Sequence, residues 1–140
     1  TEDLQGKRIS MIRAIEDAGI DAADIGVVMA NASGIPQQDK LEAQALENVF
    51  GQNIKNVRVT SVKPVTGHLI YGSGGVETAA SAITLSENAV PPLVNFEKAA
   101  PDCNLPIVSE SHEPLKSNTL LLNAFGFGGQ NASLILKKSE

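Results

Sequence analysis

Lys63 and His68 are the residues of this chain whose types and spacing best suit chemistry. An ammonium and an imidazole lie five positions apart in Ser61-Val62-Lys63-Pro64-Val65-Thr66-Gly67-His68, directly before the glycine-rich turn Tyr71-Gly72-Ser73-Gly74-Gly75. Histidine can donate or accept a proton near neutral pH, and α/β sheets build their sites on loops at the C-terminal ends of strands. The alternatives are a structural histidine bonded to backbone and a solvated surface lysine. The pair favours a site more than either residue alone.

Two glycine-rich segments follow Lys63 and His68 in the sequence. Phe125-Gly126-Phe127-Gly128-Gly129 places three glycines within four positions, which allows positive φ angles and backbone N–H groups aimed at a ligand, as in an oxyanion hole. A tight hairpin between two core strands fits that segment equally well. Residues 71–75 can cradle an anion at a helix N-terminus, but they lack the spacing of a P-loop or a Rossmann fingerprint. Close helix–strand packing is the preferred interpretation there.

Composition excludes several classes of function. The 140 residues carry a net charge of −5 without a basic tract, so nucleic-acid binding has little support. Cys103 is the only cysteine, which excludes an internal disulfide and fits a reducing compartment. It lies in a turn-like, acid-flanked stretch and is interpreted as a structural or surface residue. No apolar run reaches membrane-spanning length, no signal peptide is evident, and no metal or cofactor motif is found. We expect a cytoplasmic protein.

Hydrophobic periodicity predicts a layered α/β fold with a mixed sheet, in one domain over residues 1–140. The first helix carries Ile9, Ile12 and Ile15 on one face and closes near Gly19. The expected elements that follow are a strand (25–30), a loop (31–38), a helix (39–50) ended by Gly51, a strand (57–62), a helix (75–88), a long ordered excursion (91–117) and two strands (119–123 and 132–136) joined by the glycine turn.

Two details of these helices matter for the site. Asp39 is expected to be the N-cap of the 39–50 helix, with Glu42 as its capping-box partner. The 75–88 helix is expected to present a face of small and apolar residues, among them Val76 and Ile83, that permits close packing.

Residues 61–68 resemble the S-x-K-x-x-x-G-H motif of β-ketoacyl synthases, which are thiolase-fold condensing enzymes. Residues 123–131 resemble the N-x-F-G-F-G-G-x-N motif of the same family, and residues 91–97 resemble a further family segment. The motifs occur in the family's order and span most of the chain. The resemblance therefore implies the C-terminal half of a thiolase-like, layered α-β-α fold.

The resemblance also implies roles for individual residues. His68 would polarise the carbonyl of a malonyl thioester, and Lys63 would orient the site electrostatically, paired with Glu42. Asp39 and Glu42 fall where the family has an Asp and a Glu after its histidine–threonine loop.

The glycine turn has implied roles too. Phe127 would gate the acyl pocket, with Gly128 and Gly129 beside the oxyanion hole.

One departure from the family is as informative as the match. The family's first catalytic histidine belongs in an H-G-T-x-T-P loop, and residues 31–36 read Asn-Ala-Ser-Gly-Ile-Pro instead. Asn31 thus replaces the histidine, and an amide can donate a hydrogen bond but cannot take up a proton at neutral pH. Losing such a group typically costs about 10²–10⁴ in rate. Its loss is typical of chain-length-factor subunits, whereas the intact motifs around His68 and Phe127 are typical of active ketosynthases.

The resemblance covers only a C-terminal half, and the family's nucleophilic cysteine belongs to the half that should precede Thr1. We therefore expect an exposed apolar face, a partner (the N-terminal ketosynthase half or a partner ketosynthase subunit) and no condensation by this chain alone. The implied function is part of a ketosynthase that condenses acyl and malonyl thioesters on acyl carrier protein in fatty acid or polyketide synthesis. The alternative is a non-catalytic, chain-length-factor-like subunit of a heterodimer. A free-standing small-ligand-binding domain is a third, weaker possibility.

Overall fold

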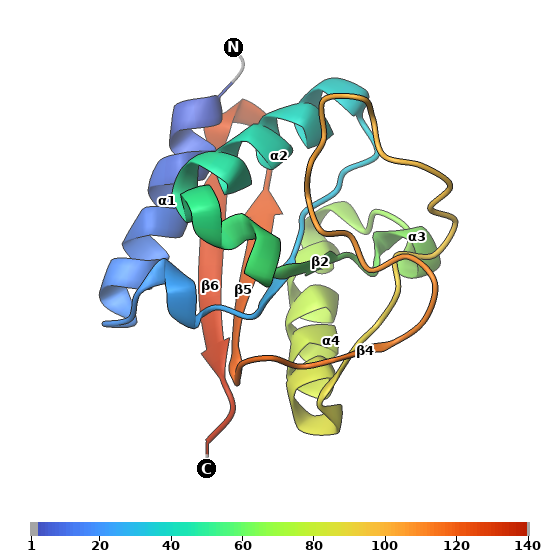
Figure 1. The fold of residues 1–140 in the computed structure, drawn as a ribbon. Helices are drawn as coiled ribbons and strands as arrows, with labels where there is room; N and C mark the ends of the chain where they lie inside the picture. Colours follow the sequence, from blue (N-terminus) through green and yellow to red (C-terminus); the bar gives the residue numbers. More distant parts are fainter. Residues whose placement is uncertain (1–2, 140) are drawn as a thin grey trace.

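The computed structural model describes residues 3–139 as a layered α/β domain (Figure 1). The α-helices and the strands of the main sheet are α1 (Leu4–Asp17), β1 (Val27–Met29), α2 (Pro36–Phe50), β2 (Arg58–Thr60), α3 (Lys63–Thr66), α4 (Ser73–Glu87), β5 (Thr119–Phe125) and β6 (Asn131–Lys137). The remaining elements of residues 3–139 are two short strands, β3 (Ala89–Val90) and β4 (Glu113–Pro114), and four 3₁₀ segments at Ala22–Asp24, Gly51–Asn56, Ile70–Gly72 and Phe127–Gly129. Each of the expected long elements is present, with boundaries shifted by a few residues.

The main sheet has the strand order β2-β1-β5-β6. β1 pairs in parallel with both β2 and β5, while β5 and β6 pair antiparallel across the glycine turn. A parallel bridge between Val59 and Ile107 brings the 91–117 excursion against the β2 edge. The prediction of a mixed sheet is confirmed, and β1 is buried on both faces as its continuous apolar run requires.

Side-chain alternation along the strands separates two hydrophobic clusters, one on each face of the sheet. Val28 of β1 and Leu121 of β5 pack with the α1 and α2 side, against Met11, Leu46 and their neighbours. Val27, Met29, Leu120 and Leu122 instead form the opposite cluster, together with Leu85 of α4. The sheet is therefore sandwiched between α1 with α2 on one face and α4 on the other.

Two helix details differ from the sequence prediction. α2 begins at Pro36 rather than after Asp39, because a proline at the first helical position costs no backbone hydrogen bond. Asp39 is consequently inside the first turn, and the predicted capping box with Glu42 is wrong. In α1, Ile9 is exposed while Lys7, Met11 and Ile15 are buried, so the buried face is rotated from the predicted one.

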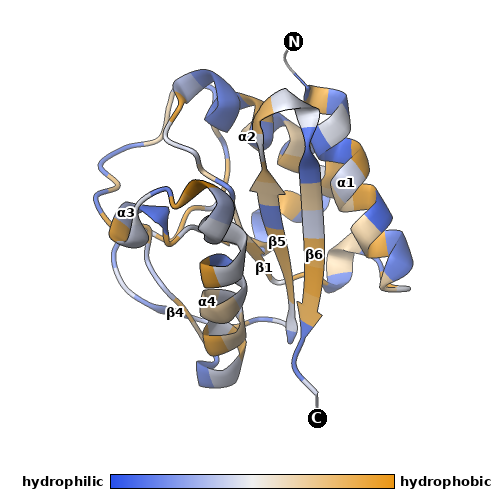
Figure 2. Ribbon diagram, turned by 180° about the vertical axis from the view of Figure 1, so that it is seen from behind, coloured by the Kyte–Doolittle hydropathy of each residue, from blue (hydrophilic) through white to orange (hydrophobic). Residues whose placement is uncertain are grey.

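α4 is oriented with its more polar side inward. Ser73, Glu77, Ser81 and Thr84 are buried, whereas Val76 and Ile83 of the predicted packing face are exposed. Exposed Leu69, Ile70 and Tyr71 continue this surface before the helix. Figure 2 shows orange, hydrophobic stretches along α4 and on the neighbouring part of β6. The expected exposed apolar face is thus present on the α4 side of the sheet, and we call Leu69, Ile70, Tyr71, Val76 and Ile83 the α4 surface.

Candidate active site

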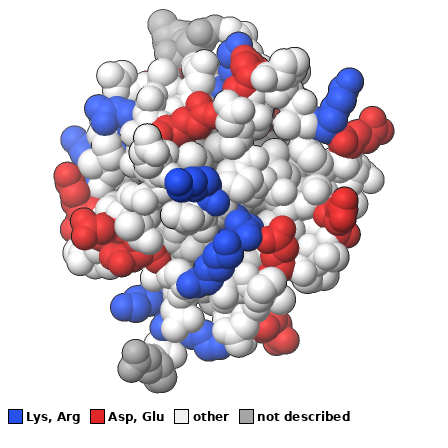
Figure 3. Space-filling model, viewed as in Figure 1, with Lys and Arg blue, Asp and Glu red and all other residues white. Residues whose placement is uncertain are grey.

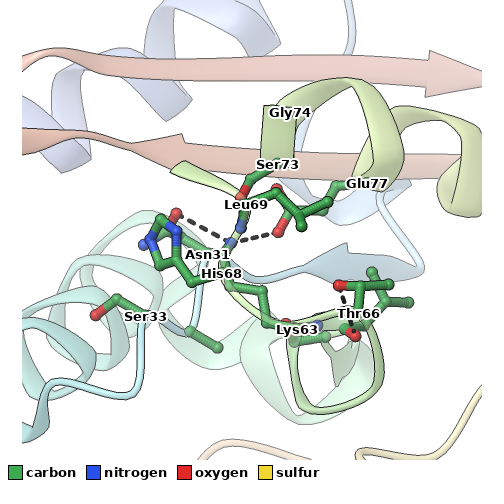
Figure 4. Close-up of polar contacts among 12 residues, drawn as sticks. Asn31, Ser33, Lys63, Thr66, His68, Leu69, Ser73, Gly74 and Glu77 are labelled. Carbon is green, nitrogen blue, oxygen red and sulfur yellow. Dashed lines mark hydrogen bonds and ion pairs between the residues drawn. The ribbon is translucent and has the colours of Figure 1, made fainter. Parts of the chain in front are cut away.

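Lys63 is the centre of a buried polar cluster (Figure 4). It opens α3, immediately after β2, and its side chain is only 5% exposed. The ammonium forms an ion pair with Glu77 of α4 and donates a hydrogen bond to Asn31 Oδ1 at 3.3 Å. Lys63 is therefore an internal charge fixed by partners on two other segments, and the surface-lysine alternative is wrong.

The predicted pairing of Lys63 with Glu42 is also wrong, since the carboxylate that pairs with Lys63 belongs to Glu77. Sequence reasoning missed Glu77 because it took the outward, apolar side of α4 for the packing side. A single acidic residue with Ser73, Ser81 and Thr84 on one side of an otherwise apolar helix is the signal that could have found it.

Glu42 instead holds the loop that follows β1. Its two carboxylate oxygens accept hydrogen bonds from the backbone N–H groups of Asn31 and Ala32, each at 2.8 Å. Asn123 Nδ2 donates to Glu42 Oε1 at 3.2 Å. Burial raises the pKa of Glu42, against the opposing effect of these hydrogen bonds. The carboxylate also secures an unusual conformation, because Ala32 has a φ of 39° where the family motif has glycine.

Asp39 supports the other end of the same loop. Its carboxylate accepts from Ser33 Oγ at 3.1 Å and from the Gly34 N–H at 3.2 Å. Gly34 has a φ of 80°, which glycine adopts without strain. Asp39 and Glu42 thus both hold residues 31–34, and neither carboxylate is hydrogen-bonded to Lys63.

A chain of polar side chains behind Glu42 was not predicted from the sequence. Asn123 of β5 is fully buried and accepts a hydrogen bond from Ser133 Oγ of β6 at 2.9 Å. Ser133 and Ser10 of α1 share a further hydrogen bond at 3.0 Å. The loop after β1 is therefore connected through Glu42 and Asn123 to β5, β6 and α1. Isolated serines and asparagines give no sequence signal for such long-range contacts.

His68 lies in an exposed loop after α3, and its ring has a defined tautomer. The Ile70 N–H donates to His68 Nδ1 at 3.1 Å, so the neutral ring carries its proton on Nε2. That Nε2–H is the ring's outward donor. The bend that creates this geometry uses a φ of 75° at Gly67 and 51° at Ile70. His68 can therefore be bonded to the backbone and still act on a ligand, because Nδ1 accepts from the loop while the Nε2–H is available.

The glycine turn between β5 and β6 is tight. The Gly126 N–H donates to the Gln130 carbonyl at 2.7 Å, and Gly128 and Gly129 have φ angles of 77° and 81°. Phe127 is exposed at the tip. The turn meets the Lys63 cluster through Phe125, whose N–H donates to Asn31 Oδ1 at 3.1 Å. Roles for Phe127, Gly128 and Gly129 toward a ligand stay predictions.

The glycines at 74 and 75 do not serve close packing. A Cβ added at either position would meet nothing within 4 Å apart from its chain neighbours and the backbone of its own helix. The interpretation of this turn as a helix–strand packing device is therefore wrong within residues 3–139. The space beside these glycines is open and adjoins the α4 surface.

A mostly apolar cavity of about 480 Å³ lies between α2 and the 91–117 excursion. Its wall includes Ala32, Asp39 and Glu42, so the cavity reaches the loop after β1, and it also includes Cys103, a free and partly buried thiol. Figure 3 shows basic and acidic side chains interspersed over one face, without a broad basic patch there. None of the helices within residues 3–139 combines the length and the apolar character that a bilayer crossing requires.

Comparison with known proteins identifies the family. The model of the β-ketoacyl synthase C-terminal domain matches residues 1–97. The 3-oxoacyl-(acyl-carrier-protein) synthase 2 of Synechocystis sp. is 35% identical over 138 residues, covering 99% of this chain and 33% of that protein. The chain therefore spans about a third of the length of such relatives.

Solved structures agree in fold. The ishigamide ketosynthase/chain length factor has a TM-score of 0.92 and 26% identity, over 98% of this chain and 34% of that one. A β-ketoacyl synthase from Burkholderia phymatum has a TM-score of 0.90 and 27% identity, over 96% and 32%. The fold is that of thiolase-like ketosynthases. This chain belongs to the β-ketoacyl synthase C-terminal domain family.

The Lys63–Glu77 ion pair predicts a non-additive response to mutation. Replacing Lys63 by Met leaves a buried carboxylate without its cation and should lower the free energy of unfolding by about 3–5 kcal/mol. The double variant Lys63→Met/Glu77→Leu should recover most of that loss, because no buried charge is left. Chemical denaturation of both single variants and the double variant measures the coupling. Simple addition of the two single effects would contradict this buried pair.

Glu42 predicts a pH-dependent response. Glu42→Gln places an amide N–H₂ against a backbone N–H and should cost about 1–3 kcal/mol. Because the folded-state pKa of Glu42 is raised, its contribution to the free energy of unfolding is largest below the ordinary carboxyl pKa of 4.5 and falls as pH rises through the raised value. The difference in unfolding free energy between wild type and Glu42→Gln should therefore shrink from pH 4.5 to 7. A difference that grows over this range would show a depressed pKa instead.

Proposed function

We propose that this chain supplies one wall of a decarboxylative condensation site, acting on acyl and malonyl thioesters of acyl carrier protein in fatty acid or polyketide synthesis. The observation that carries the proposal is that the Asn31 side chain is hydrogen-bonded to both Lys63 and Phe125. His68 lies on the loop that follows α3. This brings two family motifs, and the loop that departs from a third, together at the C-terminal ends of β1, β2 and β5, where an α/β sheet places its chemistry.

Each residue has a defined part in this proposal. His68 donates its Nε2–H to the thioester oxygen of the malonyl unit, which polarises the carbonyl. Lys63 supplies a buried positive charge that keeps Asn31 in place. Asp39 and Glu42 hold the loop that carries Asn31.

The glycine turn completes the proposed site. Phe127, exposed at the tip of the turn, gates the acyl pocket, and Gly128 and Gly129 border the oxyanion region.

The nucleophile is proposed to come from another segment or subunit. Cys103 is the only cysteine of the chain, and it borders the cavity between α2 and the excursion. The α4 surface is apolar and exposed, as expected of a face that packs on an N-terminal ketosynthase half or a partner ketosynthase subunit. Residues 1–140 then form one domain of a larger assembly, which we place in the cytoplasm because the single cysteine of this chain fits a reducing compartment.

A second function is favoured by Asn31. With an amide at the first histidine position, the chain can serve as a chain-length-factor-like subunit that shapes the acyl tunnel of an active partner without itself condensing thioesters. The similarity to the ishigamide ketosynthase/chain length factor is compatible with this role. The two functions differ in whether His68 is required for turnover.

Histidine substitution separates the two functions. In the assembly that contains the cysteine-bearing half, His68→Ala should lower the condensation rate by about 10²–10⁴. Asn31→His should leave the rate equal or higher, since it restores the family residue. Product formation from acyl and malonyl carrier-protein thioesters measures both. Full activity of His68→Ala would favour the structural role, and turnover by the isolated chain would contradict the need for a partner half.

The α4 surface predicts a partner-dependent effect. Ile83 is 61% exposed, so Ile83→Glu should change the unfolding free energy of this chain by less than about 0.5 kcal/mol. Burying the new carboxylate against an apolar partner should weaken association at least about tenfold. Ile9→Glu on α1 is the matched control, because Ile9 is exposed on the other side of the sheet. Equal effects of the two variants on partner affinity would rule out the α4 surface as the interface.

A further inference from the structure

The cavity between α2 and the 91–117 excursion has the size of a small-molecule site. Its volume of about 480 Å³ lies within the range of about 300–1,000 Å³ that is typical of ligand pockets. Ala30 and Ser61 line it and directly follow β1 and β2, so it lies beyond the carboxyl ends of two parallel strands, where open α/β sheets bind ligands. The apolar part of its wall includes Leu46, Val59, Leu93, Phe96, Leu105 and Ile107.

The carboxylates in the cavity wall already have partners. Asp39 and Glu42 accept hydrogen bonds from the loop after β1. Asp102 of the excursion forms an ion pair with Lys40 of α2, with 2.5 Å between Oδ2 and Nζ. A cationic ligand would therefore find no vacant carboxylate among these residues.

Lys98 is the remaining charged residue of the wall. Within residues 3–139 no ion pair or hydrogen bond joins its ammonium to another residue. A carboxylate on a ligand that lies in the cavity can therefore pair with Lys98 without displacing a protein group. The wall thus combines a large apolar surface with one vacant cation.

The middle of the excursion covers the cavity and is weakly attached to α2. The two sides of the excursion are anchored, because the Leu93 N–H donates to the Val108 carbonyl at 2.7 Å and the Val108 N–H donates to the Val59 carbonyl at 3.0 Å. Between these anchors, the Lys40–Asp102 pair ties the excursion to α2, and its side chains are 57% and 56% exposed. Exposed ion pairs contribute little to stability, so this attachment can open to admit a ligand.

We propose that this cavity is a binding site for an aliphatic carboxylate, such as a medium-chain fatty acid. The alkyl chain lies against the apolar wall, the carboxylate pairs with Lys98, and residues 94–104 form the cover. The inference uses only the cavity and its wall, so it is independent of the condensation function and of the residues proposed for it.

Protection of Cys103 tests whether the cavity is occupied. Cys103 lies in the wall and is the only cysteine of the chain, so its alkylation by N-ethylmaleimide reports on this cavity. Mass spectrometry of the peptide that contains Cys103 makes the measurement specific even in the assembly that carries the cysteine-bearing half. Hexanoate, octanoate and decanoate should all protect Cys103, and the concentration for half protection should fall about fourfold for each added methylene. Absent protection, or protection that does not depend on chain length, would overturn the proposal.

Replacing Lys98 tests the preference for a carboxylate. Lys98→Gln should weaken protection by decanoate about two- to fivefold and leave protection by 1-decanol unchanged. Lys116→Gln is the matched control, because Lys116 is an exposed lysine of the same excursion outside the cavity wall. Equal effects of the two variants on decanoate would overturn the assignment of Lys98.

A larger side chain at position 43 tests the location of the alkyl chain. Ala43 of α2 lines the cavity, so Ala43→Phe should place a ring in the space and abolish protection by decanoate. A folded Ala43→Phe variant that decanoate still protects would overturn the proposal, and thermal unfolding shows whether the variant is folded. If it is not, the chain-length series and Lys98→Gln decide, since neither depends on a buried substitution. These outcomes leave the condensation function untouched, because that function is tested at His68.

Discussion

The site depends on one buried carboxylate. Glu42 receives hydrogen bonds from the backbone of Asn31 and Ala32 and from the side chain of Asn123, so a single group joins the loop after β1 to α2 and β5. Without it, the N–H groups of Asn31 and Ala32 would lose their acceptor, and Ala32 would lose the contact that holds its positive φ. The position of Asn31, and with it the link to Lys63 and the glycine turn, follows from this anchoring.

The buried charged side chains of this domain are balanced mainly by an ion pair. Lys63 and Glu77 neutralise one another, and Asn31 Oδ1 gives the ammonium a second acceptor. Lys7, also buried, lies over the Phe125 ring at 4.3 Å from its centroid, and burial lowers the pKa of its ammonium. The interior around Lys63 and Phe125 is thus built from paired ions and oriented dipoles.

Sequence patterns predicted the elements and the order of the motifs, because periodicity and glycine positions are local properties. They did not predict the partners of buried charges. Glu42 was assigned to a local capping box and to Lys63, whereas its contacts come from residues 11 and 81 positions away. Glu77 was missed because α4 has one polar side and one apolar side, and the sequence does not tell which of the two faces the sheet. The Asn31 amide could be placed only once both of its donors were known.

α4 buries its polar side and exposes apolar residues, and this bears on the order in which the domain folds. The helix contributes little apolar area to its own sheet beyond Leu85 and Ala80, and it brings a carboxylate that is tolerable only once Lys63 is in place. We therefore expect α4 to dock after the sheet has assembled with α1 and α2, and its amides to lie at the low-stability end of this domain in hydrogen exchange.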